Sequence, residues 1–266
     1  MSDKDSLKNT IVVSLLLCVV CSVVVSSAAV LLKPRQDTNK EFSRNRDVLA
    51  AAGLYDPALH DANYVVERFK SFKVRLVDIE TGEYLSDDKA RELGINPANY
   101  DQRKASKTAG LSQTLSPQDD IAGIKRQARY ATVYVLEEGG KIDRVVLPVH
   151  GYGLWSTLYG FLAVKGDGDT VLGLTFYEHG ETPGLGGEVD NPVWKAQWPG
   201  KKLFADGDEV AIHVMKKGQA NPDSPYQIDG LAGSTLTTVG VDNLIKFWVG
   251  SHGFEPYLKK LQAGEA

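Results

Sequence analysis

Cysteine is scarce in this sequence, and its placement excludes two kinds of site. The only cysteines, Cys18 and Cys21, lie inside a long apolar run near the N-terminus, and residues 33–266 contain none. A disulfide framework or a thiolate metal site is therefore excluded after that run. The CxxC spacing is typical of redox or metal chemistry. Because burial in lipid opposes the thiolate that both need, we interpret the pair as small apolar packing residues.

The signatures of several enzyme classes are also missing. No GxxxxGK[ST] phosphate loop, GxSxG elbow or HExxH helix occurs, and the short glycine pairs lack the third glycine of a dinucleotide fingerprint. The five histidines are scattered without the spacing of metal ligands. With 30 basic against 34 acidic residues and a net charge of −4, the chain has no basic excess with which to bind nucleic acid.

One uncharged stretch, residues 11–32, dominates the N-terminal region. Its 22 residues would rise roughly 33 Å as a helix, enough to cross a hydrocarbon core of about 30 Å, so they predict one transmembrane helix. A cleaved signal peptide is the alternative, because Ser26, Ser27 and Ala28 form a passable cleavage site. More basic residues follow the stretch than precede it, but large domains translocate regardless of that bias, so the orientation stays open.

The remaining chain divides at the charged segment KPRQDTNKEFSRNR. We predict an N-terminal segment at 1–10, the transmembrane helix at 11–32, a linker or frayed helix at 33–46, and a soluble domain at 47–266. The alternation of apolar residues predicts strands at 72–79, 131–137, 142–149, 158–165, 170–178 and 209–215. The middle four form two hairpins.

Helical signals flank these strands. A short helix is predicted at 48–54 and a final one at 237–248, with Gly250 available to end it, whereas 86–119 is polar and irregular. Strand runs flanked by helices without a repeating βα pattern predict an α+β domain built on an antiparallel sheet.

Two glycine-rich stretches could hold a ligand. Residues 181–187, ETPGLGG, would let backbone amides approach a flat or anionic group closely, and residues 229–238, DGLAGSTLTT, would offer a helix start to a phosphate. Taken from the residues alone, an ordinary loop and a plain N-cap are the favoured interpretations.

The second stretch also resembles a known motif. DGLAGST resembles the flavinylation motif Asp-x-x-Ser/Thr-Gly-Ala-Ser/Thr, whose last hydroxyl bears FMN through a phosphoester bond. The resemblance extends over SSAAVLL, LPVHGYGLWSTLYGF, YEHGETPGLGGEV and GFEPYLKKL. The chain is similar to the C-subunit family of sodium-translocating NADH:quinone oxidoreductases, a bacterial respiratory complex. The G subunits of Rnf electron-transport complexes share the motif, but GLWS and ETPGLGGE favour the quinone reductase.

The resemblance implies a covalent flavoprotein, with one FMN per chain on Thr235. It implies a single-pass helix in the bacterial inner membrane, a cytoplasmic N-terminus, a periplasmic domain, and a flavin transferase that uses FAD and magnesium and recognises Asp229. It also implies a set of cofactor-binding neighbours: Gly233, Ser234 and Thr237 in the motif, and Leu154, Trp155, Thr182, Gly184, Leu185 and Gly186 around the ring.

The motif departs from the family pattern at two positions. Ala232 stands where Ser or Thr is usual, and Ser234 where Ala is usual. Ser234 and Thr235 therefore both offer a hydroxyl, and Thr237 follows; the spacing of six from Asp229 selects Thr235.

The function implied is electron relay inside a complex whose other subunits bind NADH, quinone and sodium. No general acid or base and no substrate pocket is expected on this chain, which would contact the other subunits, the transferase and membrane lipid, but no nucleic acid. The alternatives are an Rnf-type FMN carrier and a cofactor-free, membrane-anchored periplasmic binding or assembly module.

Overall fold

The computed structural model describes residues 7–206 and 209–266. The chain divides between Arg44 and Asn45 into two units. Its elements in chain order are α1 (Leu7–Ala51), α2 (Ala62–Phe69), β1 (Phe72–Asp78), α3 (Asp87–Glu92), η2 (Pro97–Asn99), α4 (Gln102–Ala105), β2 (Ser112–Thr114), β3 (Arg126–Ala128), β4 (Tyr130–Glu138), β5 (Lys141–Tyr152), β6 (Thr157–Lys165), β7 (Val171–Glu178), η3 (Gly186–Asp190), α5 (Pro192–Lys195), β8 (His213–Val214), β9 (Gln227–Ile228), α6 (Thr235–Val249) and α7 (Glu255–Ala263).

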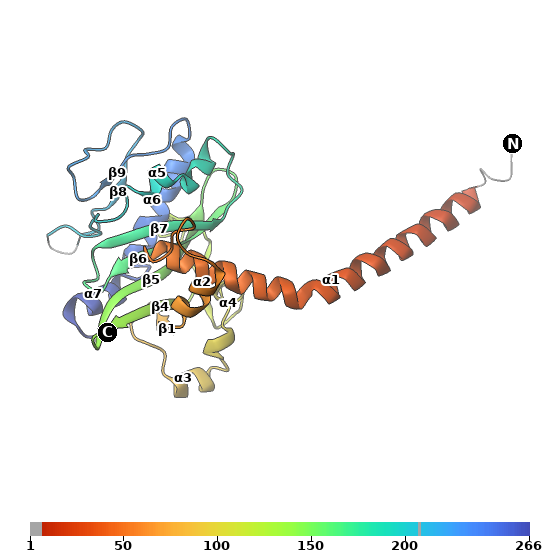
Figure 1. The fold of residues 1–266 in the computed structure, drawn as a ribbon, viewed down its shortest axis with the longest axis horizontal. Coiled ribbons are helices and arrows are strands. Elements are labelled where there is room, and N and C mark those ends of the chain that lie inside the picture. Colours follow the sequence, from red (N-terminus) through yellow and green to blue (C-terminus); the bar gives the residue numbers. More distant parts are fainter. Residues whose placement is uncertain (1–6, 207–208) are drawn as a thin grey trace. The chain divides into compact units, whose positions relative to one another are not determined.

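The N-terminal helix α1 is continuous well beyond the apolar stretch (Figure 1). Residues 33–46, predicted as a linker or frayed helix, are helical, and the predicted separate helix at 48–54 is the last part of α1, which ends at Ala51. The segment after Pro34 lacks glycine and is rich in Lys, Arg, Gln and Glu, which propagate helices well. Gly53, with a φ of 69°, then ends the helix because its left-handed backbone suits glycine.

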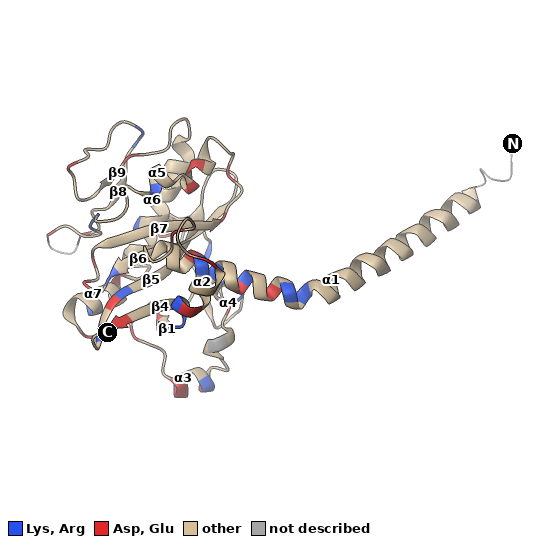
Figure 2. Ribbon diagram, viewed as in Figure 1, with Lys and Arg blue, Asp and Glu red and all other residues tan. Residues whose placement is uncertain are grey.

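Among the described residues, α1 is the one helix long and apolar enough to cross a membrane. Figure 2 shows its apolar part free of charged residues, whereas Lys, Arg, Asp and Glu are interspersed after it. The prediction of a membrane-spanning helix agrees with this composition, and the boundaries of the predicted segments stay predictions.

A five-stranded antiparallel sheet, in the order β1-β4-β5-β6-β7, forms the centre of the second unit. The predicted hairpins are confirmed: β4 and β5 join through Gly139 and Gly140, whose φ values of 60° and 77° suit a tight turn. β6 and β7 form the second hairpin. Strand β1, also predicted, pairs with the outer edge of β4.

Helices cover both faces of this sheet (Figure 1). Side chains alternate along β5, so Val145, Leu147 and Val149 share one buried face with residues of α6 and α7. On the other face, Phe69 of α2 lies edge-on to Tyr134 of β4. Burial of each of the three β5 side chains, Val145, Leu147 and Val149, stabilises the fold by about 1.5–3 kcal/mol relative to an exposed position. The predicted α+β class with an antiparallel sheet is confirmed.

The strand predicted at 209–215 is much shorter than expected. Only β8, His213–Val214, is present, and it pairs in parallel with β9. The amide of Val214 donates to Asp242 Oδ1 on α6 at 2.8 Å, so a side chain takes the place of a second strand along that edge. Residues 86–119, predicted to be irregular, contain only short elements.

Candidate functional site

The loop 229–234 leads directly into α6, and glycine is required in it twice. Gly233 has a φ of 67°, a left-handed backbone that favours glycine. A Cβ at Gly230 would collide with the carbonyl oxygen of Met215 and lie 2.8 Å from Thr238 Cγ2. Thr238 ties the loop to the helix, because its Oγ1 accepts from the Leu231 amide at 3.0 Å and donates to the Ser234 carbonyl at 3.0 Å.

The three neighbouring hydroxyls of the motif differ sharply in exposure. Thr235, the first residue of α6, is exposed, whereas Ser234 is 6% exposed and Thr237 is fully buried. Ser234 Oγ donates to Thr237 Oγ1 at 2.9 Å, and Thr237 Oγ1 donates to Glu181 Oε2 at 2.7 Å. Ser234 therefore makes no side-chain capping bond, which leaves the first amides of a 15-residue helix without a side-chain cap.

Glu181 is the centre of a buried polar group that we call the Glu181 cluster: Glu181, Ser234, Thr237 and the backbone amides of 154–156. Its Oε1 accepts from the amides of Leu154, Trp155 and Ser156 at 3.1, 3.0 and 3.3 Å. Burial favours the neutral carboxyl, but the hydrogen bonds from Thr237 and these amides outweigh it and lower the pKa of Glu181. The carboxylate is therefore ionised at neutral pH.

Glycines let the backbone close around this carboxylate. A Cβ at Gly153 would lie 2.6 Å from Glu181 Oε1, and a Cβ at Gly186 would lie 2.6 Å from Thr237 Oγ1 and 2.7 Å from Glu181 Oε2. The glycines of GYG and GLGG thus make room for the cluster, rather than only for a flexible loop.

The loop 182–187 folds back on itself beside the start of α6. The carbonyl of Thr182 accepts from the amides of Leu185 and Gly187 at 3.1 and 2.9 Å, and Gly184 has a φ of 76°. Leu185 Cδ2 would lie 3.1 Å from a Cβ at Gly233. The two glycine-rich stretches, far apart in sequence, therefore lie next to each other.

Apolar side chains remain exposed around this meeting point. Trp155 is 67% exposed, Leu185 is 44% exposed and Leu236 is 60% exposed. The amide of Trp155 donates to Glu181, Leu236 precedes Thr237 in the chain, and Leu185 lies close to Gly233; we call these three residues the apolar rim. Exposed apolar side chains on segments that adjoin in the fold are candidates for a binding surface.

Asp229 is placed differently from the hydroxyls. Its carboxylate accepts from Lys217 Nζ at 2.7 Å and from the Gly218 amide at 2.6 Å, while its carbonyl accepts from Trp194 Nε1 at 2.9 Å. Partial burial opposes ionisation, but Lys217 and Gly218 outweigh it and lower the pKa of Asp229. Asp229 thus fixes the turn at 216–218 beside the motif.

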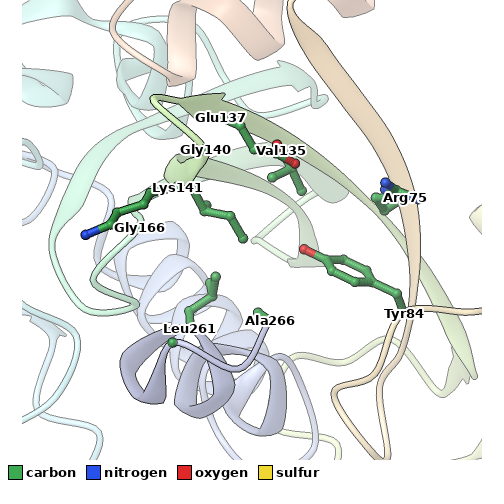
Figure 3. Close-up of a pocket in the computed structure, with 11 residues that line it drawn as sticks. Arg75, Tyr84, Val135, Glu137, Gly140, Lys141, Gly166, Leu261 and Ala266 are labelled. Carbon is green, nitrogen blue, oxygen red and sulfur yellow. The ribbon is translucent and has the colours of Figure 1, made fainter.

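A separate cavity of about 500 Å³ shares no residue with the Glu181 cluster or the apolar rim. It is lined by Arg75, Tyr84, Val135, Glu137, Gly140, Lys141, Ile142, Gly166, Leu261, Gly264 and Ala266. Figure 3 shows the ring of Tyr84 directed into it, and the Tyr84 hydroxyl lies 2.7 Å from that of Tyr257. None of the predicted site residues lines this cavity.

Known proteins resemble the chain over its whole length. A Pseudomonas aeruginosa protein, named as the C subunit of a Na(+)-translocating NADH-quinone reductase, is 48% identical over 269 residues, covering 100% of both chains. A Yersinia pestis protein of the same name is 44% identical, covering 98% of this chain and 96% of the relative. The chain belongs to this family of NADH-quinone reductase C subunits.

Solved structures agree with this membership. Shewanella oneidensis NqrC is 36% identical, with a TM-score of 0.75, and the match covers 85% of this chain and 99% of the other. The C subunit from Parabacteroides distasonis, 24% identical with a TM-score of 0.63, shares the fold. The resemblance of the sequence to this C-subunit family is confirmed, and so is its place as a component of an oxidoreductase complex.

The family's FMN-binding domain matches residues 153–250. This range contains the Glu181 cluster, the apolar rim and α6, so the matched domain and the converging residues coincide. The residues fit FMN on three counts: an exposed hydroxyl and an uncapped helix start for the phosphate, glycines that allow close backbone approach, and exposed apolar side chains for a flat ring.

Sequence patterns do not single out two members of this site, Glu181 and Leu236. Glu181 lies in a glycine-rich loop, and Leu236 lies just before the predicted final helix at 237–248. A signal for Glu181 exists, because it is the one charge within the otherwise uncharged stretch 180–187. Leu236 has none, since an apolar residue in the first turn of a helix is ordinary.

Proposed function

We propose that this chain is the FMN-carrying electron-transfer subunit of a sodium-translocating NADH:quinone reductase, with FMN bound covalently through a phosphoester to Thr235. The observation that carries the proposal is the exposure of the hydroxyls: Thr235 is open at the start of α6, whereas Ser234 and Thr237 are buried and hydrogen-bonded to each other. A group that must react with a transferase has to reach the surface.

The start of α6 suits the phosphate. The uncapped amides and the positive end of the helix dipole favour an anion there, and the first turn contains no acidic residue to repel one. In the modification, the Thr235 oxygen forms a bond to the flavin-side phosphorus of FAD, the bond between the two phosphates breaks, AMP leaves and the hydroxyl proton is lost. A flavin transferase would supply the magnesium and the base.

The apolar rim suits the ring. Bound FMN supplies one- and two-electron transfer, and the protein positions it. Since a covalent tether replaces free concentration by a high effective one, Trp155, Leu185 and Leu236 need not enclose the ring tightly. Thr182 and Gly184 are exposed in the same loop as Leu185, and Leu154 is half-buried beside Glu181. A shallow site leaves the ring open to neighbouring redox centres.

The membrane arrangement is part of the same proposal. The apolar part of α1 would cross the bacterial inner membrane in contact with lipid, with the N-terminus cytoplasmic and the FMN domain periplasmic. The family membership supports this arrangement, since the charges near the helix do not decide the orientation. The other subunits of the complex would be the electron donors and acceptors.

Mass spectrometry of the full chain tests the proposal. Coexpressed with a flavin transferase, the chain should gain the mass of one FMN less water on the peptide that contains Thr235, and the gain should persist after denaturation. Thr235→Ala should abolish it, whereas the matched Ser234→Ala variant should keep it. Flavin retained by Thr235→Ala would contradict the acceptor assignment.

The same experiment separates the alternatives. A wild-type chain without flavin, despite a competent transferase, would favour a cofactor-free binding or assembly module. A flavinylated chain that copurifies with an Rnf complex would favour the Rnf-type carrier. Copurification with the quinone reductase subunits is the expected result.

A further inference from the structure

One buried carboxylate in this domain has no part in the chemistry proposed above. Glu181 is 5% exposed, and its hydrogen-bond donors are neutral: three amides of the loop 154–156 and the Thr237 hydroxyl. A buried charge is costly unless hydrogen bonds satisfy it, so a position that serves only packing would be more stable with an apolar residue. The carboxylate therefore calls for a role that depends on its acceptor oxygens.

The two oxygens of Glu181 join two separate parts of the site. Oε1 holds the loop that carries Trp155, and Oε2 holds the first turn of α6 through Thr237. Trp155 and the acceptor hydroxyl belong to segments about 80 residues apart, and this carboxylate links them directly.

The carboxylate also determines which hydroxyl donates and which accepts in the hydrogen bonds that link Glu181, Thr237 and Ser234. An ionised carboxylate can only accept, so the Thr237 hydrogen must point to Glu181. Thr237 Oγ1 is then an acceptor for the Ser234 hydrogen, and both hydrogens point inward. Thr235 takes no part in this chain of hydrogen bonds, and its exposed hydroxyl stays available.

We infer that Glu181 is a positioning residue for flavin attachment: it holds the Trp155 loop against the start of α6 and turns the Ser234 and Thr237 hydroxyls inward, which restricts modification to Thr235. The inference rests on the proposed function. It also accounts for the departure of this motif from the family pattern, because the extra hydroxyl of Ser234 is prevented from competing with Thr235.

Substitution by glutamine separates the two parts of the role. In Glu181→Gln, the amide oxygen can still accept from residues 154–156, but the amide nitrogen must donate to Thr237 Oγ1. The Thr237 hydrogen then turns to Ser234 Oγ, and the Ser234 hydrogen is released, so that the Ser234 side chain loses its inward anchor and is free to rotate toward the surface. Thr235→Ala alone should carry no flavin, whereas Thr235→Ala/Glu181→Gln should gain flavin on Ser234, located by peptide mass spectrometry after coexpression of the full chain with the transferase.

A second variant tests the same hydroxyl chain without touching the carboxylate. Thr235→Ala/Thr237→Val removes the acceptor of the Ser234 hydrogen and should also gain flavin on Ser234. If neither double variant is labelled on Ser234 while the wild type is labelled on Thr235, the restriction of modification by Glu181 is overturned.

Hydrogen exchange on the flavin-free full chain tests the link to the Trp155 loop independently of flavin. Glu181→Ala should speed exchange of the amides of residues 154–156 about tenfold, the size expected for the loss of a hydrogen bond to a charged group. Asp242→Ala is the matched control, because Asp242 of α6 is a similarly buried carboxylate that accepts from the Val214 amide instead. Its variant should leave the exchange of 154–156 unchanged.

The outcomes distinguish the two proposals. Unchanged exchange at 154–156 in Glu181→Ala, or an equal increase in Asp242→Ala, would overturn the positioning role. A wild-type chain that stays unlabelled would instead overturn the proposed function, and the exchange result would still decide whether Glu181 holds the loop. Should Glu181→Ala fail to fold, Glu181→Gln and Thr237→Val supply the labelling result.

Discussion

Two buried carboxylates, one beside α6 and one within it, are held in different ways. At the start of the helix, Glu181 accepts from backbone amides and a hydroxyl, all neutral donors that are themselves fixed in place. In the middle of the helix, Asp242 accepts from the Val214 amide but also lies 2.8 Å from Lys246 Nζ and from His213 Nδ1. Both residues are less than a tenth exposed.

The difference indicates how much each end tolerates change. Lys246 and His213 are partly exposed side chains that can adjust, and water can replace them. The donors to Glu181 cannot adjust without moving the loop 154–156 or the helix itself. We therefore expect the start of α6 to be sensitive to small displacements and its later turns to be robust.

The largest effect is expected from a single methyl group at Gly186. In Gly186→Ala, the Cβ would lie 2.6 Å from Thr237 Oγ1, so the Glu181 cluster must open, and overpacking of this kind costs about 2–3 kcal/mol. Urea unfolding of the flavin-free chain measures the loss, and flavin yield should fall with it.

Gly184→Ala in the same loop is the control. A Cβ there meets nothing within 4 Å, and only the φ of 76° opposes the change, at a cost of about 1 kcal/mol. Equal losses in the two variants would contradict the view that the cluster, rather than the loop backbone, is the sensitive part.

An intermediate effect is expected from acid. The hydrogen bonds to Glu181 outweigh its burial and hold its pKa below the ordinary value of 4.5, so the folded state releases this proton more readily than the unfolded chain does. The stability it contributes is present above pH 4.5 and is lost as the pH falls below that value through the lowered pKa. Urea unfolding between about pH 3 and pH 7 should therefore give a steeper acid decline for the wild type than for Glu181→Gln. Parallel curves would contradict the pKa shift.

The sequence predicts the sheet far better than it predicts the sensitivity of the start of α6 to small displacements. Alternating apolar residues and paired glycines predict the hairpins because these signals are local. In β4 to β7, the residues next to each position in the sequence indicate which face of the sheet it occupies. The helical course of 33–46 has no such signal, because polar helices lack an apolar stripe. The strand predicted at 209–215 is too long because the partner of Val214 is Asp242, 28 residues later.

The residues of the candidate site also differ in whether a local sequence pattern can predict them. The motif resemblance predicts Thr235 as the acceptor, and the two glycine-rich stretches stand out from the residues themselves, since both signals lie within short segments. It does not single out Glu181, because the role of this residue depends on contacts to residues 154–156 and to Thr237, which no local pattern reports. Exposure, which separates Thr235 from Ser234, is likewise a property of the folded chain.

The smallest effect is expected at the later part of α6. Lys246 Nζ lies 2.8 Å from Asp242 Oδ2 and 2.7 Å from His213 Nδ1, and its side chain is 33% exposed. His213 Nδ1 can accept from Lys246 or donate to Asp242, but it cannot do both at once. Lys246→Met therefore frees Nδ1 to donate to Asp242 while the Val214 amide stays bound, and the loss should be about 0.5 kcal/mol in urea unfolding. Asp242→Asn, which changes the acceptor itself, should cost more. A loss in Lys246→Met as large as that in Gly186→Ala would mean that both ends of α6 depend equally on fixed geometry.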